Sequence, residues 1–151
     1  MKTFKDINEI LDFAIGEEQA AVDFYLMLAS KSASRQSRDV FTEFAREEMR
    51  HKANLTRIKE QGTFQLSVEK VQDLRITECL VDIKPSADMS YQEALILAMK
   101  KEKAAFRMYL ELAGKATETD LRDFFQTLAQ EESKHKLRFE IEYDDYILRE
   151  N

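Results

Sequence analysis

The sequence predicts an all-α protein, an antiparallel four-helix bundle made of two related helical hairpins. Glycine and proline number only three and one in 151 residues, whereas alanine, leucine, glutamate and lysine are abundant, which is typical of long helices. Apolar residues recur at spacings of three and four over four long stretches, as on the buried face of a helix. We expect one domain, residues 1–151, consisting of a hairpin at about 6–61, a crossover at about 62–89 and a second hairpin at about 90–149.

The first hairpin carries local signals for where its helices begin and end. Asp6 and Glu9 form a candidate capping box, with Asp6 as N-cap and the Glu9 carboxylate reaching back to its backbone amide. The helix is expected to fail near residues 30–36, where serines compete for backbone hydrogen bonds. A second helix is expected over about residues 37–61, and Gly62 is suited to end it.

The crossover has a different character from the segments around it. It contains the only proline of the chain and many apolar residues without a sustained helical period. A segment of this length can run along a whole bundle, since extended chain covers roughly 3.3 Å per residue. Its apolar content argues against a disordered linker, so we expect a packed strap with one short helix near residues 68–74. The lone Cys79 excludes an internal disulfide and a metal centre of several cysteines, and it is expected to be an inert buried thiol.

The second hairpin repeats the first at a constant offset of 84 positions, which holds without a gap through Lys136. Its helices are expected at about 91–115 and 119–148, with residues 143–146 in a solvated last turn. Unrelated amphipathic helices share apolar character but not identity at charged positions, so internal duplication accounts better for the match. The identical pairs include Glu9/Glu93, Glu18/Glu102, Tyr25/Tyr109, Asp39/Asp123, Phe41/Phe125, Glu48/Glu132 and His51/His135.

Six polar residues of the repeat occupy positions on the apolar stripes and are therefore aimed at the core. Each hairpin supplies one isolated glutamate and one Glu-x-x-His motif: Glu18, Glu48 and His51 in the first, Glu102, Glu132 and His135 in the second. Buried ionised carboxylates cost several kcal/mol unless positive charge meets them. No lysine or arginine lies on the stripes, but two divalent cations offset four carboxylates. Glutamate oxygen with imidazole nitrogen suits iron, manganese or zinc better than copper(I) or calcium.

Some neighbouring residues have a second interpretation. A single Glu-x-x-His motif usually reflects a surface pair or a capping contact, but two copies at matched distances favour a two-metal site. Glu17, Glu47 and Glu131 lie one residue off the stripe, about 100° around the helix, and we expect them to be solvated. Tyr25 and Tyr109 are at least core aromatics, and either hydroxyl can also reach a ligating carboxylate.

The pattern Glu-x-x-Ala-x-x-x-Tyr in both hairpins, with the two Glu-x-x-His motifs, resembles the ferritin-like superfamily. Within it the chain looks most like the rubrerythrin group and secondarily like bacterioferritin, over nearly its whole length. The resemblance implies a ferritin-like bundle with the long crossover between the second and third helices. It also implies bridging carboxylates at Glu48 and Glu132, with Glu18 and Glu102 as terminal carboxylates and the two histidines each capping one metal.

The same resemblance implies two iron ions and a reaction of the diferrous centre with hydrogen peroxide or dioxygen. Rubrerythrins usually carry an extra glutamate one turn after the third-helix ligand, where this chain has Ala105. They also usually carry a four-cysteine rubredoxin-like domain, so here electrons are expected from a separate rubredoxin-like donor. The alternatives are a ferroxidase or iron-handling protein, and a bundle that binds zinc or manganese without redox turnover.

Charge and hydropathy narrow the partners. The net charge of −6 and the pI near 5.1 argue against nucleic acid. No apolar run approaches 18 residues, and the N-terminus lacks the apolar core of a signal peptide. We therefore expect a cytoplasmic protein without membrane contact. We also expect a homodimer or a larger homo-oligomer.

Overall fold

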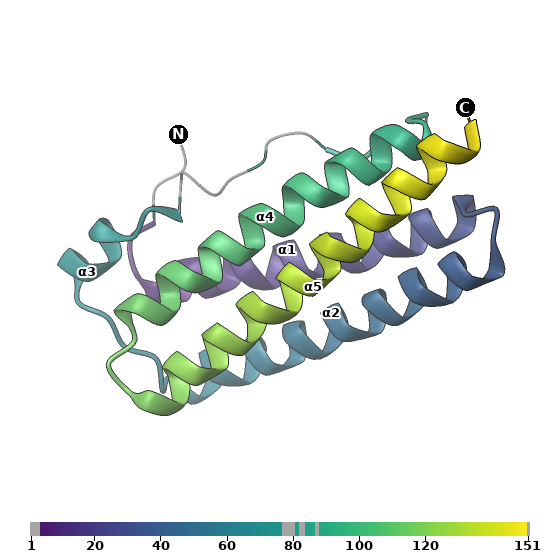
Figure 1. Ribbon diagram of the computed structural model, residues 1–151. Coiled ribbons are helices and arrows are strands. Elements are labelled where there is room, and N and C mark those ends of the chain that lie inside the picture. Colours follow the sequence, from purple (N-terminus) through teal and green to yellow (C-terminus); the bar gives the residue numbers. More distant parts are fainter. Residues whose placement is uncertain (1–3, 77–80, 82–83, 87, 151) are drawn as a thin grey trace.

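Four long helices form an antiparallel bundle (Figure 1), which confirms the predicted fold class. The structure is a computed structural model, and it describes residues 4–76, 81, 84–86 and 88–150. Within these residues, no helix combines the length and the apolar character needed to cross a membrane. The helices are α1 (Ile7–Lys31), α2 (Arg35–Gln61), the short α3 (Val68–Asp73), α4 (Tyr91–Lys115) and α5 (Thr119–Glu150).

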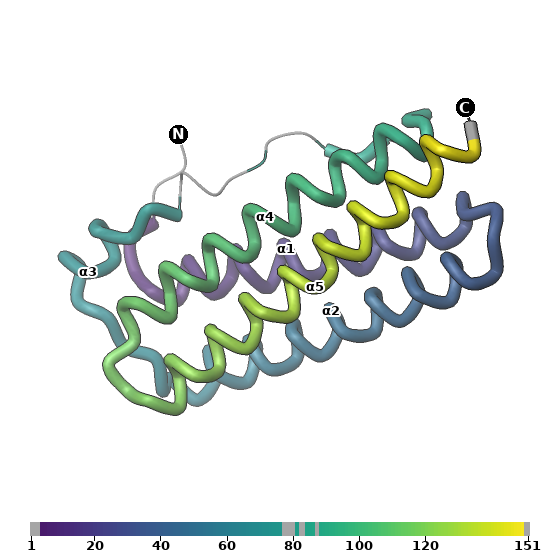
Figure 2. Tube along the Cα trace, in the orientation of Figure 1, coloured from purple at the N-terminus to yellow at the C-terminus, as the bar shows by residue number. Residues whose placement is uncertain are grey.

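Each hairpin pairs its own two helices, α1 with α2 and α4 with α5, through short connections. After α2 the chain forms α3 at one end of the bundle, whereas α4 begins at the other end (Figures 1 and 2). The chain therefore travels the length of the bundle between α2 and α4. As a result, α1 lies antiparallel to α4 as well as to α2, which is the arrangement that the predicted crossover requires. The expectation for Cys79 lies outside the described residues.

The start of α1 corrects one sequence prediction. The Glu9 amide donates to the Asp6 carboxylate at 3.0 Å, as a capping box requires. The Glu9 carboxylate, however, accepts from the Lys5 amide at 2.7 Å rather than from that of Asp6. Asp6 is in an extended conformation, with φ of −151° and ψ of 176°. The Lys5 amide, rather than the Asp6 amide, is the donor to the Glu9 carboxylate. The equivalent box at Ser90 and Glu93 is complete, with both reciprocal bonds present.

The ends of α2 are set by two small residues. Ser34 caps its start by accepting the Ser37 amide at 3.0 Å, so the helix begins at Arg35 rather than at Ser37. Gly62 ends it with φ of 63°, and its amide donates to the carbonyl oxygen of Ile58 at 3.1 Å. This left-handed conformation favours glycine because other side chains are strained there.

The core is divided into two apolar clusters. One lies toward the α3 end and includes residues such as Leu11, Leu112 and Phe125, with side chains of the strap, Phe64 and Ile76 among them, packed against it. The described residues of the strap at this end are therefore packed, as predicted. The other cluster occupies the opposite half of the bundle. On α1 and on α5 the two clusters leave a gap in the middle of the helix, which polar residues fill.

A buried carboxylate ties three helices together at the end where α4 begins. Glu142 of α5 is 4% exposed. It accepts from the Ser37 hydroxyl of α2 at 2.9 Å and from the Tyr91 hydroxyl of α4 at 3.0 Å. This end of the bundle is thus closed by hydrogen bonds as well as by apolar packing.

The prediction of a solvated last turn at residues 143–146 is wrong for its two tyrosines. Tyr143 and Tyr146 are half-buried and pack against the second apolar cluster. The Tyr146 ring meets that of Tyr91 with centroids 5.3 Å apart. The reason is that α5 continues beside α4 through Glu150, so one face of its last turns stays covered.

Candidate metal centre

The six polar residues predicted from the apolar stripes meet in the middle of the bundle, between the two apolar clusters. Each long helix contributes, because Glu18 comes from α1 and Glu102 from α4, while α2 and α5 each supply one Glu-x-x-His motif. All six side chains are nearly inaccessible to solvent, with exposures of 1% to 3%: Glu18, Glu48, His51, Glu102, Glu132 and His135.

Helical geometry explains why each motif presents both its side chains to the centre. Residues three apart lie on the same face of a helix, so Glu48 and His51 project together from α2. Glu132 and His135 do the same from α5. The sequence therefore places two donors per motif, and the packing of the hairpins brings the motifs to face each other.

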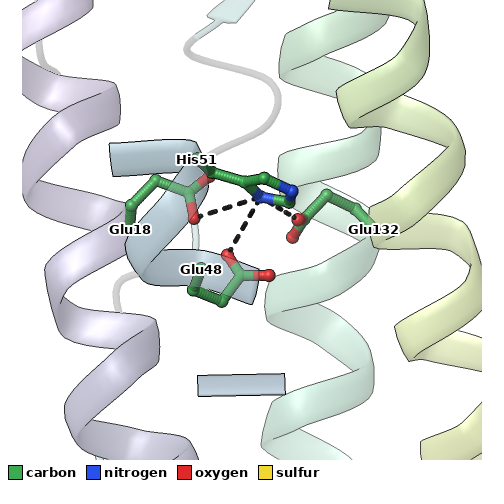
Figure 3. A group of neighbouring side chains, drawn as sticks. All are labelled: Glu18, Glu48, His51 and Glu132. Carbon is green, nitrogen blue, oxygen red and sulfur yellow. Dashed lines mark ion pairs between the residues drawn. The ribbon is translucent and has the colours of Figure 1, made fainter. Parts of the chain in front are cut away.

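The first half of the centre surrounds His51 (Figure 3). Its Nδ1 atom lies 3.1 Å from Glu132 Oε1, 3.6 Å from Glu18 Oε2 and 3.7 Å from Glu48 Oε2. The three carboxylates come from α5, α1 and α2, and Figure 3 shows them converging on one imidazole nitrogen.

The second half is related to the first by the internal repeat. His135 Nδ1 lies 3.0 Å from Glu48 Oε1 and 3.8 Å from Glu102 Oε2. In the part of the chain that the structure describes, the four glutamates of the centre form ion pairs only with the two histidines. No lysine or arginine there forms an ion pair with them.

The donor atoms form two overlapping groups. One contains Glu18, Glu48, His51 and Glu132, and the other contains Glu48, Glu102, Glu132 and His135. Within each group the ligand atoms all lie within 4.8 Å of one another. Glu48 and Glu132 belong to both groups, so the two candidate ion sites overlap at these two carboxylates.

One atom of each of these six residues is buried and has no hydrogen-bond partner. Such atoms are uncommon in folded proteins, because an unpaired buried polar atom costs free energy. Their convergence on the centre of two overlapping groups fits a pair of bound cations. The atoms are Glu18 Oε2, Glu48 Oε1, His51 Nδ1, Glu102 Oε2, Glu132 Oε1 and His135 Nδ1.

Two further glutamates hold the histidines from outside the centre. Glu131 of α5 is hydrogen-bonded to His51 Nε2, and Glu47 of α2 is hydrogen-bonded to His135 Nε2. The prediction that Glu47 and Glu131 are solvated is therefore wrong, whereas Glu17 is exposed as expected. A position 100° off the stripe of its own helix still faces the interface between α2 and α5, where the histidine of the other hairpin lies.

A signal in the sequence distinguishes these glutamates from Glu17. Glu47 and Glu131 are identical at the repeat offset, while Glu17 is matched by Lys101. Identity at a charged position in both halves indicates a shared role. The role is to fix the imidazole: an Nε2–H group that donates to a carboxylate leaves Nδ1 as the free lone pair, directed toward the centre.

The two repeat-related tyrosines have different contacts. The Tyr109 hydroxyl donates a hydrogen bond to Glu18 across the bundle. The Tyr25 hydroxyl makes no hydrogen bond with any residue that the structure describes, and the Tyr25 ring meets the His135 ring edge-on, with centroids 6.2 Å apart. Phe44 stacks on the same imidazole at 4.0 Å. The six donors are related by the internal repeat, but the residues around them are not arranged symmetrically.

The sequence profile of the family described as Rubrerythrin matches residues 9–143. The chain belongs to the rubrerythrin family. A solved structure described as that of a ferritin-like diiron-carboxylate protein from Thermotoga maritima superposes with a TM-score of 0.76 over 97% of this chain and 99% of that one, at 18% sequence identity. At that identity the likeness shows the ferritin-like fold. A comparison with functionally curated proteins gave no match.

The buried acids of this rubrerythrin-family chain are far from their ordinary pKa values. Burial raises the pKa of Glu18, and the charge of Glu48 raises it further. Burial also raises the pKa of Glu132, with the neighbouring Glu102 adding to the effect. Burial also acts to raise the pKa of Glu48, but its contacts with Glu18 and His135 prevail and hold that pKa well below the usual range.

The histidines are shifted toward the charged form. Burial lowers the pKa of His51, but the neighbouring carboxylates of Glu18 and Glu48 prevail and raise it to about 10. Burial lowers the pKa of His135, but the neighbouring carboxylates of Glu102 and Glu47 prevail and raise it to about 12. In the absence of metal, protons on the imidazoles thus supply part of the positive charge that the carboxylates need.

Proposed function

We propose that this rubrerythrin-family chain is a non-haem di-iron oxidoreductase that reacts with hydrogen peroxide or dioxygen. The observation that carries the proposal is the convergence of six buried donor atoms without hydrogen-bond partners. Two divalent cations satisfy these atoms together and offset the charge of the carboxylates. One Glu from each of two helices with Glu-x-x-His from each of the other two is the ligand set of di-metal carboxylate bundles.

The roles of the ligands follow from the two groups. Glu48 and Glu132, which belong to both groups, are proposed as the bridging carboxylates. Glu18 and His51 complete one ion's ligands, and the equivalent residues of the second hairpin complete the other's. Oxygen and imidazole donors suit iron, manganese and zinc, and the description of the Thermotoga structure as a diiron-carboxylate protein supports iron.

Two ferrous ions together supply the two electrons that cleavage of one O–O bond requires. The chain contributes the setting for this chemistry. Apolar clusters flank the carboxylates toward both ends of the bundle, and Tyr109 holds a proton beside Glu18. Because the chain has one cysteine, we propose that electrons return from a rubredoxin-like donor outside it.

The proposal is tested by loading the apo-protein with iron(II) under anaerobic conditions. We expect two ions per chain, followed by ferric absorbance when hydrogen peroxide or air is added, and its loss when reduced rubredoxin is supplied. Glu132→Gln should lose metal, whereas Glu140→Gln, a half-buried glutamate elsewhere on α5, should load normally. Iron(II) that stays reduced with both oxidants would contradict the redox proposal and leave a metal-binding bundle.

A ferroxidase for iron handling is the second candidate, and one observation favours it. The place where rubrerythrins usually carry an extra glutamate is Ala105 here, so the donor set stays a symmetric set of six. Storage in its own cage requires a hollow shell of many subunits. Native mass, together with the amount of iron retained per chain after aerobic loading, separates the two: a dimer that retains two ions per chain favours the oxidoreductase.

A further inference from the structure

A cavity of about 40 Å³ lies between α1 and α4 on the carboxylate side of the centre, and we call it the α1–α4 cavity. All four buried glutamates line it, but neither histidine does. The cavity therefore ends at the face of the centre that the imidazoles leave open. Its lining includes Glu18, Glu48, Glu102 and Glu132 on the inside, with Tyr25 and Tyr109 beside them.

The cavity also reaches the surface. Its lining includes Glu17 and Ala20, which are exposed, then Ala21 and Ala105, which are half-buried. Ala21 and Ala105 are related by the repeat, and each lies one turn after a buried glutamate of its helix. α1 and α4, like α2 and α5, make few close contacts with each other compared with the helix pairs inside each hairpin. The small side chains thus leave a passage between the two hairpins.

The opposite side of the centre is closed. Phe44 stacks on the His135 ring at 4.0 Å, and the Nε2 atoms of both histidines are occupied by Glu131 and Glu47. A small molecule that arrives between α2 and α5 would meet these side chains before any donor atom. The carboxylate side offers the shorter and less obstructed path.

The volume of the passage restricts what can use it. About 40 Å³ holds roughly three water-sized molecules, at about 10–15 Å³ each. Hydrogen peroxide and dioxygen are of that size. An organic hydroperoxide such as tert-butyl hydroperoxide carries a branched carbon group that cannot fit without moving the helices.

We propose that the α1–α4 cavity is the access path of the oxidant, and that Ala21 and Ala105 limit it to hydrogen peroxide and dioxygen. This inference rests on the proposed function, because it names the substrate class of that same centre. It is tested first with a probe that requires no redox reaction. Cobalt(II) is bound in place of iron, and azide is added while the visible spectrum of the cobalt is followed.

Ala105→Leu fills the passage, and Ala104→Leu is the matched control, because Ala104 is also half-buried on α4 but does not line the cavity. We expect Ala105→Leu to keep two cobalt ions per chain and to bind azide roughly tenfold more slowly or weakly. The control should behave as the wild type. If Ala105→Leu loads cobalt poorly, Ala21→Leu blocks the same passage from α1. Unchanged azide binding in the cobalt-loaded blocking variant would overturn the access path.

The size limit is tested with iron. Wild-type diferrous protein should be oxidised by tert-butyl hydroperoxide roughly 100-fold more slowly than by hydrogen peroxide, and Ala105→Gly should narrow the difference. Equal rates for the two peroxides in the wild type would overturn the size limit. The two proposals fail separately. If Ala105→Leu weakens or slows azide binding and Ala104→Leu does not, the access path is supported. If no oxidant converts iron(II) in the same wild-type protein, the redox function is overturned.

Discussion

Each histidine of the centre lies between carboxylates on its two sides. Its Nδ1 atom faces the buried acids, and its Nε2 atom is hydrogen-bonded to a glutamate of the other hairpin. Both contacts fix the orientation of the ring, but only the outer one sets which nitrogen carries the proton. Glu131 and Glu47 directly precede the proposed bridging residues in sequence. In each hairpin, therefore, the first glutamate of an adjacent pair orients a histidine and the second is a proposed metal ligand.

Loss of an outer carboxylate should weaken metal binding without removing a ligand. For Glu131→Ala and Glu47→Ala we expect a roughly 10- to 100-fold loss of cobalt(II) affinity, measured by competition with a chelator. Glu131→Gln should lose less, because the amide oxygen still accepts the hydrogen bond. Glu140→Ala, on α5 outside the centre, is the control. Wild-type affinity in both alanine variants would show that the imidazoles need no outer support.

The two tyrosines allow a matched comparison. Tyr109→Phe removes the hydrogen bond to the buried Glu18 and should lower the free energy of unfolding of the apo-protein by about 1 kcal/mol. Tyr25→Phe removes a hydroxyl without such a bond and should change it by less than about 0.5 kcal/mol. Urea denaturation measures both. A larger loss for Tyr25→Phe than for Tyr109→Phe would contradict the asymmetry of the centre.

At the scale of the helices, ends and glycines follow local rules. Ser34, Ser67 and Ser90 each cap a helix by accepting an amide three residues later. Gly62 is left-handed, while Gly16 is in the middle of α1 with nothing within 4 Å of an added Cβ atom. The two glycines therefore respond to the same substitution in opposite ways.

Gly16→Ala should stabilise the protein by about 0.5–1 kcal/mol, since alanine loses less backbone entropy in a helix than glycine. Gly62→Ala should destabilise it by about 1–2 kcal/mol, because a Cβ atom is strained at that φ. Thermal and urea unfolding of the apo-protein measure both changes. Stabilisation by Gly62→Ala would mean that α2 does not end in the conformation described.

At the scale of the whole molecule, the centre joins the two hairpins. Each donor group takes residues from both hairpins, so neither hairpin can complete a site alone. A metal that binds only the folded chain stabilises it by about 2.7 kcal/mol at 100 times its dissociation constant. Removal of metal with a chelator should therefore lower the unfolding temperature, and the outer-carboxylate variants should show a smaller difference between loaded and apo forms.

The apo-protein should lose stability as pH rises. The pKa values of His51 and His135 are raised to about 10 and about 12 in the folded protein. Their protonation therefore stabilises the fold fully below about pH 6.5, and this stabilisation is lost as pH rises through the two raised values. Glu18 and Glu132, also raised, act in the same direction. The lowered pKa of Glu48 has the opposite effect, but only at acid pH: the stabilisation by its ionised carboxylate is lost as pH falls below the ordinary range of a glutamate. We expect the free energy of unfolding to fall between about pH 6.5 and about pH 10.

Metal should reverse this dependence. The ligands must give up their protons to bind a cation, so affinity for metal rises with pH. Urea unfolding across that pH window, with chelator and with excess metal, measures both trends. If the metal-free protein, kept so by chelator, became more stable toward pH 10, the proposed protonation of the centre would be contradicted.

The amino-acid sequence by itself determined the helices, their repeat and the six inward-facing polar residues. These depend on spacing within one helix, where a period of 3.6 residues fixes which side chains share a face. The ferritin-like bundle and the rubrerythrin resemblance followed from them and are confirmed, while the ligand roles remain our proposal.

Only the tertiary structure decided what lies between helices. The pairing of Glu131 with His51, the difference between Tyr109 and Tyr25, and the cavity beside Ala105 each depend on how two helices pack. The same spacing that put Glu47 and Glu131 off the stripe could not show that a neighbouring helix covers them. Contacts across an interface depend on the separation, rotation and side-chain rotamers of both helices, and none of these is encoded by the period of one helix alone.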